Sequence, residues 1–443
     1  MLKHIFPHKI CIRRHLLFYL LSLITIIIVM VSSFTFLNKN NRDGIIVEVP
    51  VNVIDSNGNF VDKRWETYLR KRKPVGIIFF SEHFKNREFG KKIIKIIRNT
   101  INDEVILSAD EEGGRINRFH WLNIDSAEEI AEAYKTIKKR SGTNKAKAYV
   151  RNKYIPMFKE MNYLGLNTTF APNLDLNKYA SLDKNTEEYK NYKKCVQYTK
   201  LIRLNKNKIK PEEKNDYNNS LLFFAYLDEI GIRSLSVMNR VIDEEYVRNK
   251  WAKISIKKKK KLIKQFEKLK KYANYANVIG DRSFGNDTEI VSEVSEIFVD
   301  TAKEFGINCV AKHALGHGRV DGDTHVGKQH SNASINEILH DIEPYIYLKN
   351  KINLIMPSHI VYDSIDNKNT AINSKKVLDF IREKVKKDLL FITDDISMNG
   401  AEKNKKNPCD LSIATHKSID EVIEIGKKKK VNTKLIKKIL IQK

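Results

Sequence analysis

The sequence predicts an α/β protein folded as a (β/α)8 TIM-type barrel. Two observations carry this prediction: short apolar runs recur eight times along the chain, and most of them are separated by stretches with helical spacing and charged faces. Apolar strands that alternate with amphipathic helices indicate a parallel sheet buried on both faces. A chain of 443 residues is long enough for such a barrel and its core.

The eight expected strands are residues 45–51, 74–80, 104–110, 166–172, 307–313, 352–358, 389–395 and 409–414. Polar residues stand at or just after the carboxyl ends of five of them: Asp110, Asp175, Lys312 with His313, His359, and Asp394 with Asp395. In a barrel these ends converge on one mouth, where the active site is built. A doubly wound sheet gathers ligands only near its switch point, so the spread over five strands favours the barrel.

A stretch near the start of the chain predicts membrane attachment. Residues 16–37 form an uncharged apolar segment that is long enough to span a bilayer. This segment follows a basic tail at residues 1–15. No good cleavage site follows, so we expect an uncleaved anchor rather than a signal peptide. The basic tail predicts the amino terminus inside and the rest of the chain on the outer face; the opposite orientation, facing the cytoplasm, is less favoured.

Residues 45–443 form the expected barrel domain, interrupted by an insertion at residues 177–276 that is rich in Lys, Asn and Tyr. We expect the first half of this insertion to be poorly ordered and the second half to be helical. A second irregularity is the short passage at residues 400–408, which leaves little room for a helix between the last two strands.

Charge and cysteine usage exclude several classes of protein. The formal net charge is +26, but the lysines are spread along the chain and no nucleic-acid motif accompanies them, so we expect no nucleic-acid partner. The four cysteines are widely spaced without a CxxC pair, which argues against disulfides and a zinc knuckle.

The stretch 312–325, "KHALGHGRVDGDTH", combines three histidines with two aspartates. A zinc site would use several of these side chains, but the ammonium of Lys312 beside His313 repels a cation, and no paired ligand motif is present. An acid/base function requires fewer residues to be placed together, because one carboxylate beside one histidine is sufficient. Asp323 stands two residues before His325, so its carboxylate can fix the orientation and charge of the imidazole. We therefore favour an acid/base loop over a metal site.

The stretch 394–400, "DDISMNG", places a carboxylate at the end of an apolar strand. A carboxylate nucleophile must remain ionised, and cations at other strand ends, Lys312, Arg118 and Arg282, can keep it so. The alternative is that these aspartates only cap a helix. An aspartate nucleophile and a separate proton donor together are the equipment of a retaining glycosidase.

Six motifs in order resemble the bacterial β-N-acetylglucosaminidases of glycoside hydrolase family 3. The likeness covers about residues 45–425 outside the insertion, and the motifs are "SADEEGGRINRF" (108–119), "FAPNLDL" (170–176), "VIGDRSFG" (278–285), "KHALGHGRVDGDTH" (312–325), "MPSHIVY" (356–362) and "TDDISMNGA" (393–401). Several ordered motifs are far more specific than any one of them alone.

The resemblance implies roles for nine residues. Asp394 matches the family's nucleophile, and His325 matches its acid/base, with Asp323 as the partner of the histidine. The residues that match the binding site of the terminal N-acetylglucosamine are Asp110, Arg118, Arg282, Lys312, His313 and Met398. The resemblance further implies muropeptide fragments of peptidoglycan as substrates and no metal or organic cofactor.

The chain departs from the family pattern at two places in these motifs. Ala314 and Leu315 replace the usual Phe and Pro, and Glu111 stands where Gln is common. We predict a monomeric, membrane-anchored hydrolase that removes terminal β-linked N-acetylglucosamine with retention. Two alternatives stay open: a catalytically impaired sugar-binding or scaffold protein of the same fold, and a metal-dependent barrel hydrolase.

Overall fold

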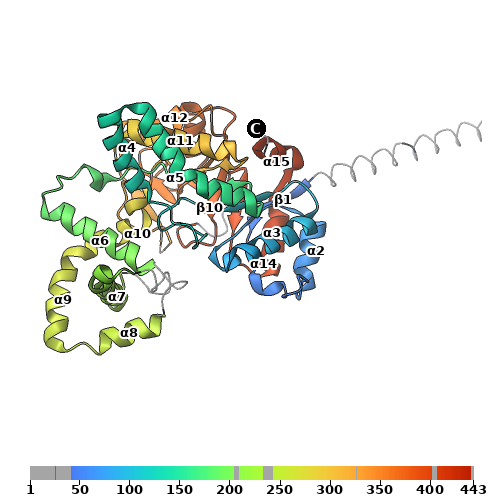
Figure 1. The fold of residues 1–443 in the computed structure, drawn as a ribbon. Helices are drawn as coiled ribbons and strands as arrows, with labels where there is room; N and C mark the ends of the chain where they lie inside the picture. Colours follow the sequence, from blue (N-terminus) through green and yellow to red (C-terminus); the bar gives the residue numbers. More distant parts are fainter. Residues whose placement is uncertain are drawn as a thin grey trace, which may run out of the picture.

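The computed structural model describes Thr25 and residues 41–203, 209–232, 243–325, 327–401 and 407–440. Its central feature is a nearly closed, mostly parallel sheet surrounded by helices (Figure 1). The strands in chain order are β1 (Asn41–Val47), β2 (Pro74–Ile78), β3 (Ile106–Ala109), β4 (Thr168–Thr169), β5 (Asn308–Cys309), β6 (Ala311–Ala314), β8 (Leu354–Pro357), β10 (Leu390–Asp395) and β11 (Leu411–Ala414). Each predicted apolar run therefore contains at least one strand.

The strand order identifies a barrel. Neighbours run β5-β4-β3-β2-β1-β11-β10-β8-β6, and every adjacent pair is parallel. The two ends of this path, β5 and β6, are consecutive pieces of one predicted run, separated only by Val310. The amide of Val310 donates to the carbonyl of Thr169 at 3.0 Å, which continues the β4–β5 pairing. The sheet thus returns on itself, as the sequence predicts.

Side chains alternate between the two sides of each strand, as the two-residue period requires. In β1, Ile46 packs inside the barrel with Val75, Ile106 and other strand residues, whereas Ile45 and Val47 pack outward against the helices. The helices around the barrel are α2 (Lys63–Lys71), α3 (Arg87–Ile101), α4 (Ala127–Ser141), α5 (Thr143–Leu164), α11 (Thr288–Glu304), α12 (Ile335–Tyr347), α13 (Lys375–Lys384) and α14 (Ile419–Lys428). Both faces of the sheet are therefore buried.

β1 begins at Asn41, four residues before the predicted strand. The reason is a tertiary contact, because Asn41–Asp43 pair antiparallel with β12 (Lys430–Asn432) near the end of the chain. The next helix, α15 (Thr433–Leu440), adds Ile436 and Ile439 to the apolar cluster inside the barrel. A separate two-stranded sheet joins β7 (Gln329–Ser331) to β9 (Ile360–Tyr362).

The insertion forms a helical lobe, defined here as helices α6 to α10. In Figure 1 the lobe projects from the barrel, with α7, α8 and α9 farthest from the sheet. The helices are α6 (Glu187–Arg203), α7 (Lys214–Glu229), α8 (Glu244–Ala252), α9 (Ile256–Leu269) and α10 (Ala273–Val278), and they enclose a hydrophobic core of their own.

The expectation of a poorly ordered first half of the insertion is wrong for α6 and α7. Tyr192, Cys195, Val196 and Tyr198 of α6 are buried at helical spacing, although lysines and asparagines dominate the surrounding composition. Burial of these few apolar side chains against α7 and α10 stabilises the helix. The Lys- and Asn-rich composition therefore did not predict α6, whereas the spacing of its apolar residues is helical.

The passage between β10 and β11 contains no helix among its described residues, 396–401 and 407–410, which agrees with the prediction. The predicted anchor at 16–37 lies outside the described residues except for Thr25. In the part of the chain that the structure describes, no helix is both long enough and apolar enough to span a membrane.

Candidate active site

Asp394 lies at the end of β10, where His313, His359 and His325 interact with its carboxylate. His313 from the end of β6 approaches it most directly, with Nε2 4.0 Å from Oδ2 of Asp394. Burial by itself raises the pKa of Asp394, but the charges of His359, His313 and His325 outweigh it and hold this pKa well below its ordinary value. Asp394 is therefore ionised at neutral pH.

His313 is fixed in place by Asp175, which follows β4. Nδ1 of His313 lies 2.7 Å from Oδ2 of Asp175, while Oδ1 of the same carboxylate accepts the backbone N–H of His317 at 2.6 Å. Burial opposes ionisation of Asp175, yet the charge of His313 and its hydrogen bond lower the pKa of Asp175 below its ordinary value. One buried carboxylate thus positions both the histidine and the loop that follows it.

His325 stands on that loop, held by Asp323. Nδ1 of His325 lies 2.7 Å from Oδ1 of Asp323, which is buried, whereas the imidazole remains 51% exposed. The glycines of this loop are required for its close path: a Cβ on Gly318 would lie 1.6 Å from the carbonyl oxygen of Leu176. The two predicted catalytic stretches also touch, because the amide of Gly400 donates to the carbonyl of Thr324 at 2.9 Å.

A buried network of ion pairs occupies the neighbouring strand ends. Glu112 accepts two hydrogen bonds from Arg282, at 2.9 and 2.7 Å, and pairs with Lys312 at 2.8 Å. Lys312 also pairs with Asp110 at 3.0 Å, and Asp110 in turn pairs with Arg118 at 3.0 Å. Four predicted sugar-binding residues therefore form one chain of contacts. Planar guanidinium and carboxylate groups of this kind suit hydroxyl recognition.

The structure brings most of the predicted site together at the carboxyl ends of the strands. Met398 lies in the turn after β10, nearly buried, with its amide donating to the carbonyl of Asp395 at 3.1 Å. The carboxylate of Asp395 has a different role from that of Asp394. It accepts hydrogen bonds from the backbone amides of Ser397 and Thr415 and stabilises the local turn.

The predicted site omitted Glu112, the residue that joins Arg282 to Lys312. Burial raises the pKa of Glu112, but the charges of Arg282 and Lys312 outweigh burial and lower this pKa far below its ordinary value. Its place just after a strand, in the acidic run "DEEGGR", was the available signal. His359 was noted only as a strand-end residue. It is fully buried near Asp394 and Asp395, and neither ring nitrogen has a hydrogen-bond partner among the described residues.

The histidines at the mouth are not arranged as metal ligands. Among the described residues, no group of three or more His, Cys, Asp and Glu side chains is placed to hold a metal ion. His317 lies buried beside Thr324, and burial lowers the pKa of its imidazole to about 4, so it is neutral at pH 7.

Glu111 gives a first testable prediction. Its side chain is fully buried, Oε2 accepts the amide of Arg118 at 2.7 Å, and Oε1 has no described partner. Burial raises the pKa of Glu111 from 4.5 to about 8, against the opposing effect of Arg118. The folded protein therefore holds a proton that the unfolded chain releases, so the contribution of Glu111 to stability is complete below pH 4.5 and lost by about pH 8.

Glu111→Gln removes this pH-dependent loss of stability, because a neutral amide does not have to bind a proton to be buried. We expect the variant to gain stability over the parent by about 1.4 kcal/mol per pH unit between pH 5 and 8, and no further gain above pH 8. Urea unfolding followed by circular dichroism at pH 5, 6, 7, 8 and 9 measures this difference. A gain that is the same at every pH would contradict a protonated Glu111.

The insertion touches the acid/base loop at the edge of the mouth. Lys178 pairs with Asp321 at 2.8 Å, and the hydroxyl of Tyr179 donates to the same carboxylate at 2.9 Å. From the other side, Arg115 donates to the carbonyls of Ala276 and Ile279 at 2.7 and 2.9 Å. Both ends of the insertion are therefore tied to loops that border the site.

Part of the chain matches the model of a known family. Residues 272–439 match the family model described as the glycosyl hydrolase family 3 N terminal domain. The resemblance to glycoside hydrolase family 3 is confirmed. The matched segment contains Arg282, His313, His325 and Asp394, whereas Asp110 and Arg118 lie before it.

Curated relatives named beta-hexosaminidase match different lengths of the chain. The protein of Glaesserella parasuis serovar 5 is 31% identical over 163 residues, which cover 34% of this chain and 48% of the relative. A longer match, to the protein of Haemophilus influenzae strain ATCC 51907, is 20% identical over 354 residues and covers 79% of the chain and 72% of the relative. In five matches at 31–33% identity, the chain spans less than half the length of the relative.

Solved structures share the fold over most of the chain. NagZ from Neisseria gonorrhoeae, in complex with N-trifluoroacetyl-D-glucosamine, superimposes with a TM-score of 0.60 at 17% identity, covering 91% of this chain and 90% of that one. LpqI from M tuberculosis superimposes with a TM-score of 0.53 at 17% identity, covering 86% and 83% of the two chains. The similarity to the folds of these solved structures therefore supports the barrel prediction, in addition to the strand order.

Proposed function

We propose that the protein is a retaining β-N-acetylhexosaminidase of the family 3 type, acting on terminal β-linked N-acetylglucosamine. The observation that carries the proposal is the environment of Asp394, an ionised carboxylate beside His313 at the mouth of the barrel. The loop that touches the Asp394 motif carries the exposed imidazole of His325, held by the buried carboxylate of Asp323. A carboxylate nucleophile and a separate proton donor at one mouth are what a retaining glycosidase requires.

The proposed reaction has two steps. In the first, Asp394 attacks the anomeric carbon while His325 gives a proton to the departing glycosidic oxygen. In the second, His325 takes a proton from a water molecule, which attacks the anomeric carbon and releases Asp394. Because Asp323 holds Nδ1 of His325, Nε2 is the nitrogen that transfers the proton. Asp323 stabilises the imidazolium that this transfer requires.

The network around Lys312 supports sugar binding at the same mouth. Asp110, Arg118, Arg282 and Lys312 supply charged donors and acceptors at several strand ends, His313 supplies an imidazole, and Met398 supplies an apolar surface. We propose muropeptide fragments of peptidoglycan as the natural substrates, in keeping with the resemblance. We also propose attachment to a membrane through residues 16–37, with the catalytic domain on the outer face.

The experiment is hydrolysis of 4-nitrophenyl N-acetyl-β-D-glucosaminide by the full chain. We expect release of 4-nitrophenol that persists in EDTA and a β-configured first product by proton NMR. Loss of turnover in EDTA with recovery on adding zinc would instead favour the metal-dependent hydrolase. A folded chain that binds N-acetylglucosamine without turnover would favour the sugar-binding protein.

His325→Ala gives a prediction that is specific for a proton donor. Removal of a general acid matters most when the leaving group is poor, so we expect a loss of about 10²-fold or more on chitobiose and a much smaller loss on the 2,4-dinitrophenyl glycoside. Steady-state kcat/KM on both substrates measures the difference. His330→Ala, a control histidine exposed on β7 and paired with Asp363, should leave both values unchanged. Equal losses on the two substrates would contradict the role of His325.

A further inference from the structure

The helical lobe carries a large share of the chain's positive charge. Residues 177–276 contain 25 Lys and Arg against 12 Asp and Glu, so this insertion accounts for half of the net charge of +26. The charge is concentrated further at α9, whose sequence Ile256–Leu269 begins with one isoleucine and five consecutive lysines.

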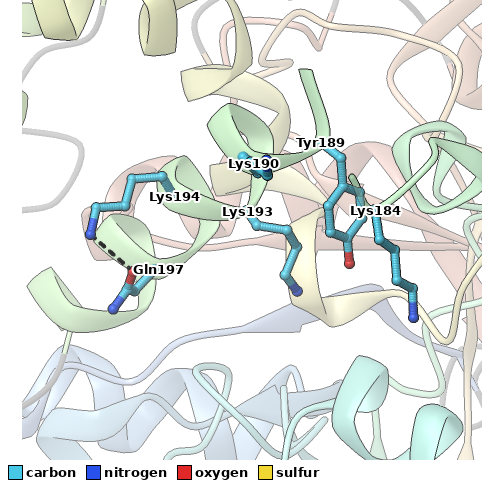
Figure 2. A pocket seen from close by; sticks show the side chains of 6 residues that line it. All are labelled: Lys184, Tyr189, Lys190, Lys193, Lys194 and Gln197. Carbon is cyan, nitrogen blue, oxygen red and sulfur yellow. Dashed lines mark hydrogen bonds between the residues drawn. The ribbon is translucent and has the colours of Figure 1, made fainter. Parts of the chain in front are cut away.

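Not every basic group of the lobe is available to a partner. Figure 2 shows a hollow on the α6 side of the lobe, with Lys194 bonded to Gln197. The hollow is lined by Lys184, Tyr189, Lys190, Lys193, Lys194 and Gln197. Lys193 pairs with Glu128 at 2.5 Å and Lys194 with Asp216 at 2.7 Å, so acidic side chains already compensate much of its charge.

The lysines of α9 are different. Lys257, Lys258, Lys260 and Lys261 are exposed, and none has an ion-pair partner in the described parts of the chain. Three of them stand in or near the first helical turn, which contains no acidic residue, so their charges oppose the helix dipole and repel one another. This arrangement weakens the helix and leaves its charge uncompensated, which is expected where the charge serves an external anion.

Apolar side chains are exposed on α9 itself and on the two helices that contact it, α7 and α8. Ile256 is 76% exposed at the start of α9, Ile230 is 40% exposed at the end of α7, and Tyr246 is 50% exposed on α8. The three helices meet at Glu229, which bonds to the indole of Trp251 on α8 and pairs with Lys259 of α9 at 3.1 Å. The corner between α7, α8 and α9 is therefore both basic and apolar.

We propose that this corner, the α9 corner (Ile230, Tyr246 and Ile256 to Lys261), docks on the surface of a membrane that contains anionic lipids. Lysines attract the headgroups, while isoleucine and tyrosine side chains enter the boundary between headgroups and acyl chains. Exposed isoleucines gain nothing from a nucleic-acid phosphate backbone, so the combination favours a lipid surface over a polyanion. The lobe borders the barrel mouth, and docking would hold that mouth near the membrane.

The test places a fluorophore at the corner of the full chain, because total vesicle binding would also report the predicted anchor at 16–37. Ile256→Cys is labelled with nitrobenzoxadiazole in a Cys11→Ser background; Cys195, Cys309 and Cys409 are buried. Vesicles contain phosphatidylcholine alone or with phosphatidylserine. We expect a blue-shifted emission only with phosphatidylserine, and its loss at about 1 M salt, where the screening length is about 3 Å.

The matched control is the same label at Val61, which is 63% exposed on the barrel and should show no shift. Changing Lys257, Lys258, Lys260 and Lys261 to Gln should raise the lipid concentration for half-maximal response at least about 10-fold without lowering the thermal midpoint. Three results would overturn the proposal. The first is no emission shift of the label at position 256, and the second is an equal shift with phosphatidylcholine alone. The third is an equal response to polyglutamate or DNA without vesicles.

Discussion

Asp394→Asn should abolish turnover of 4-nitrophenyl N-acetyl-β-D-glucosaminide, with a loss of at least about 10³-fold in kcat, the scale on which removal of a nucleophile acts in other hydrolases. Asparagine keeps the shape of the side chain and can still accept the amide of Asp395, which Asp394 Oδ1 accepts at 2.7 Å. It lacks the charge that attacks the anomeric carbon. The fold should therefore survive while the chemistry is lost.

Two further measurements separate a nucleophile from a binding residue. Asp394→Ala leaves space for azide, and sodium azide should restore turnover while producing an α-glycosyl azide, because the small anion attacks from the side that Asp394 occupied. Asp420→Asn, on the exposed first turn of α14, is the matched control and should retain parental kcat. A β-glycosyl azide, or full activity in Asp394→Asn, would show that another group is the nucleophile.

Glu112→Gln should cause the largest loss of stability among single substitutions at the site. Glu112 compensates two buried cations, Arg282 and Lys312, at 2.7 and 2.8 Å. An amide removes the negative charge but leaves both cations in a buried environment, where breaking an ion pair costs about 3–5 kcal/mol. Thermal and urea unfolding of parent and variant give the difference in the free energy of unfolding.

The matched control is Glu66→Gln on α2. Glu66 also contacts two cations, Lys63 and Arg70, each at 3.0 Å, but this triad is exposed to solvent. Exposed ion pairs contribute little to stability because solvent screens them, so Glu66→Gln should change the free energy of unfolding little. Similar losses in both variants would indicate that burial does not govern the strength of the Glu112 network.

The sequence predicted the barrel because its signals are local. Each strand run is rich in apolar residues, and the stretches between most of them have an apolar face at a period of 3.6 residues. Asp110, Asp175, His313 and Asp394 stand at or just beyond strand ends. Parallel strands in sequential order can close in few ways, so local patterns were sufficient to predict one mouth. The resemblance then predicted roles for residues that geometry places near one another.

Long-range contacts decided what local patterns could not. Glu112 and Arg282 are separated by 170 residues, and only the folded barrel makes them partners. The start of β1 at Asn41 depends on β12 at the other end of the chain. Likewise α6 is stable because α7 and α10 bury its few apolar side chains. Residue type and spacing therefore determined which elements form, whereas pairing across the barrel determined which charges are buried together, because burial and compensation depend on neighbours that the chain order does not reveal.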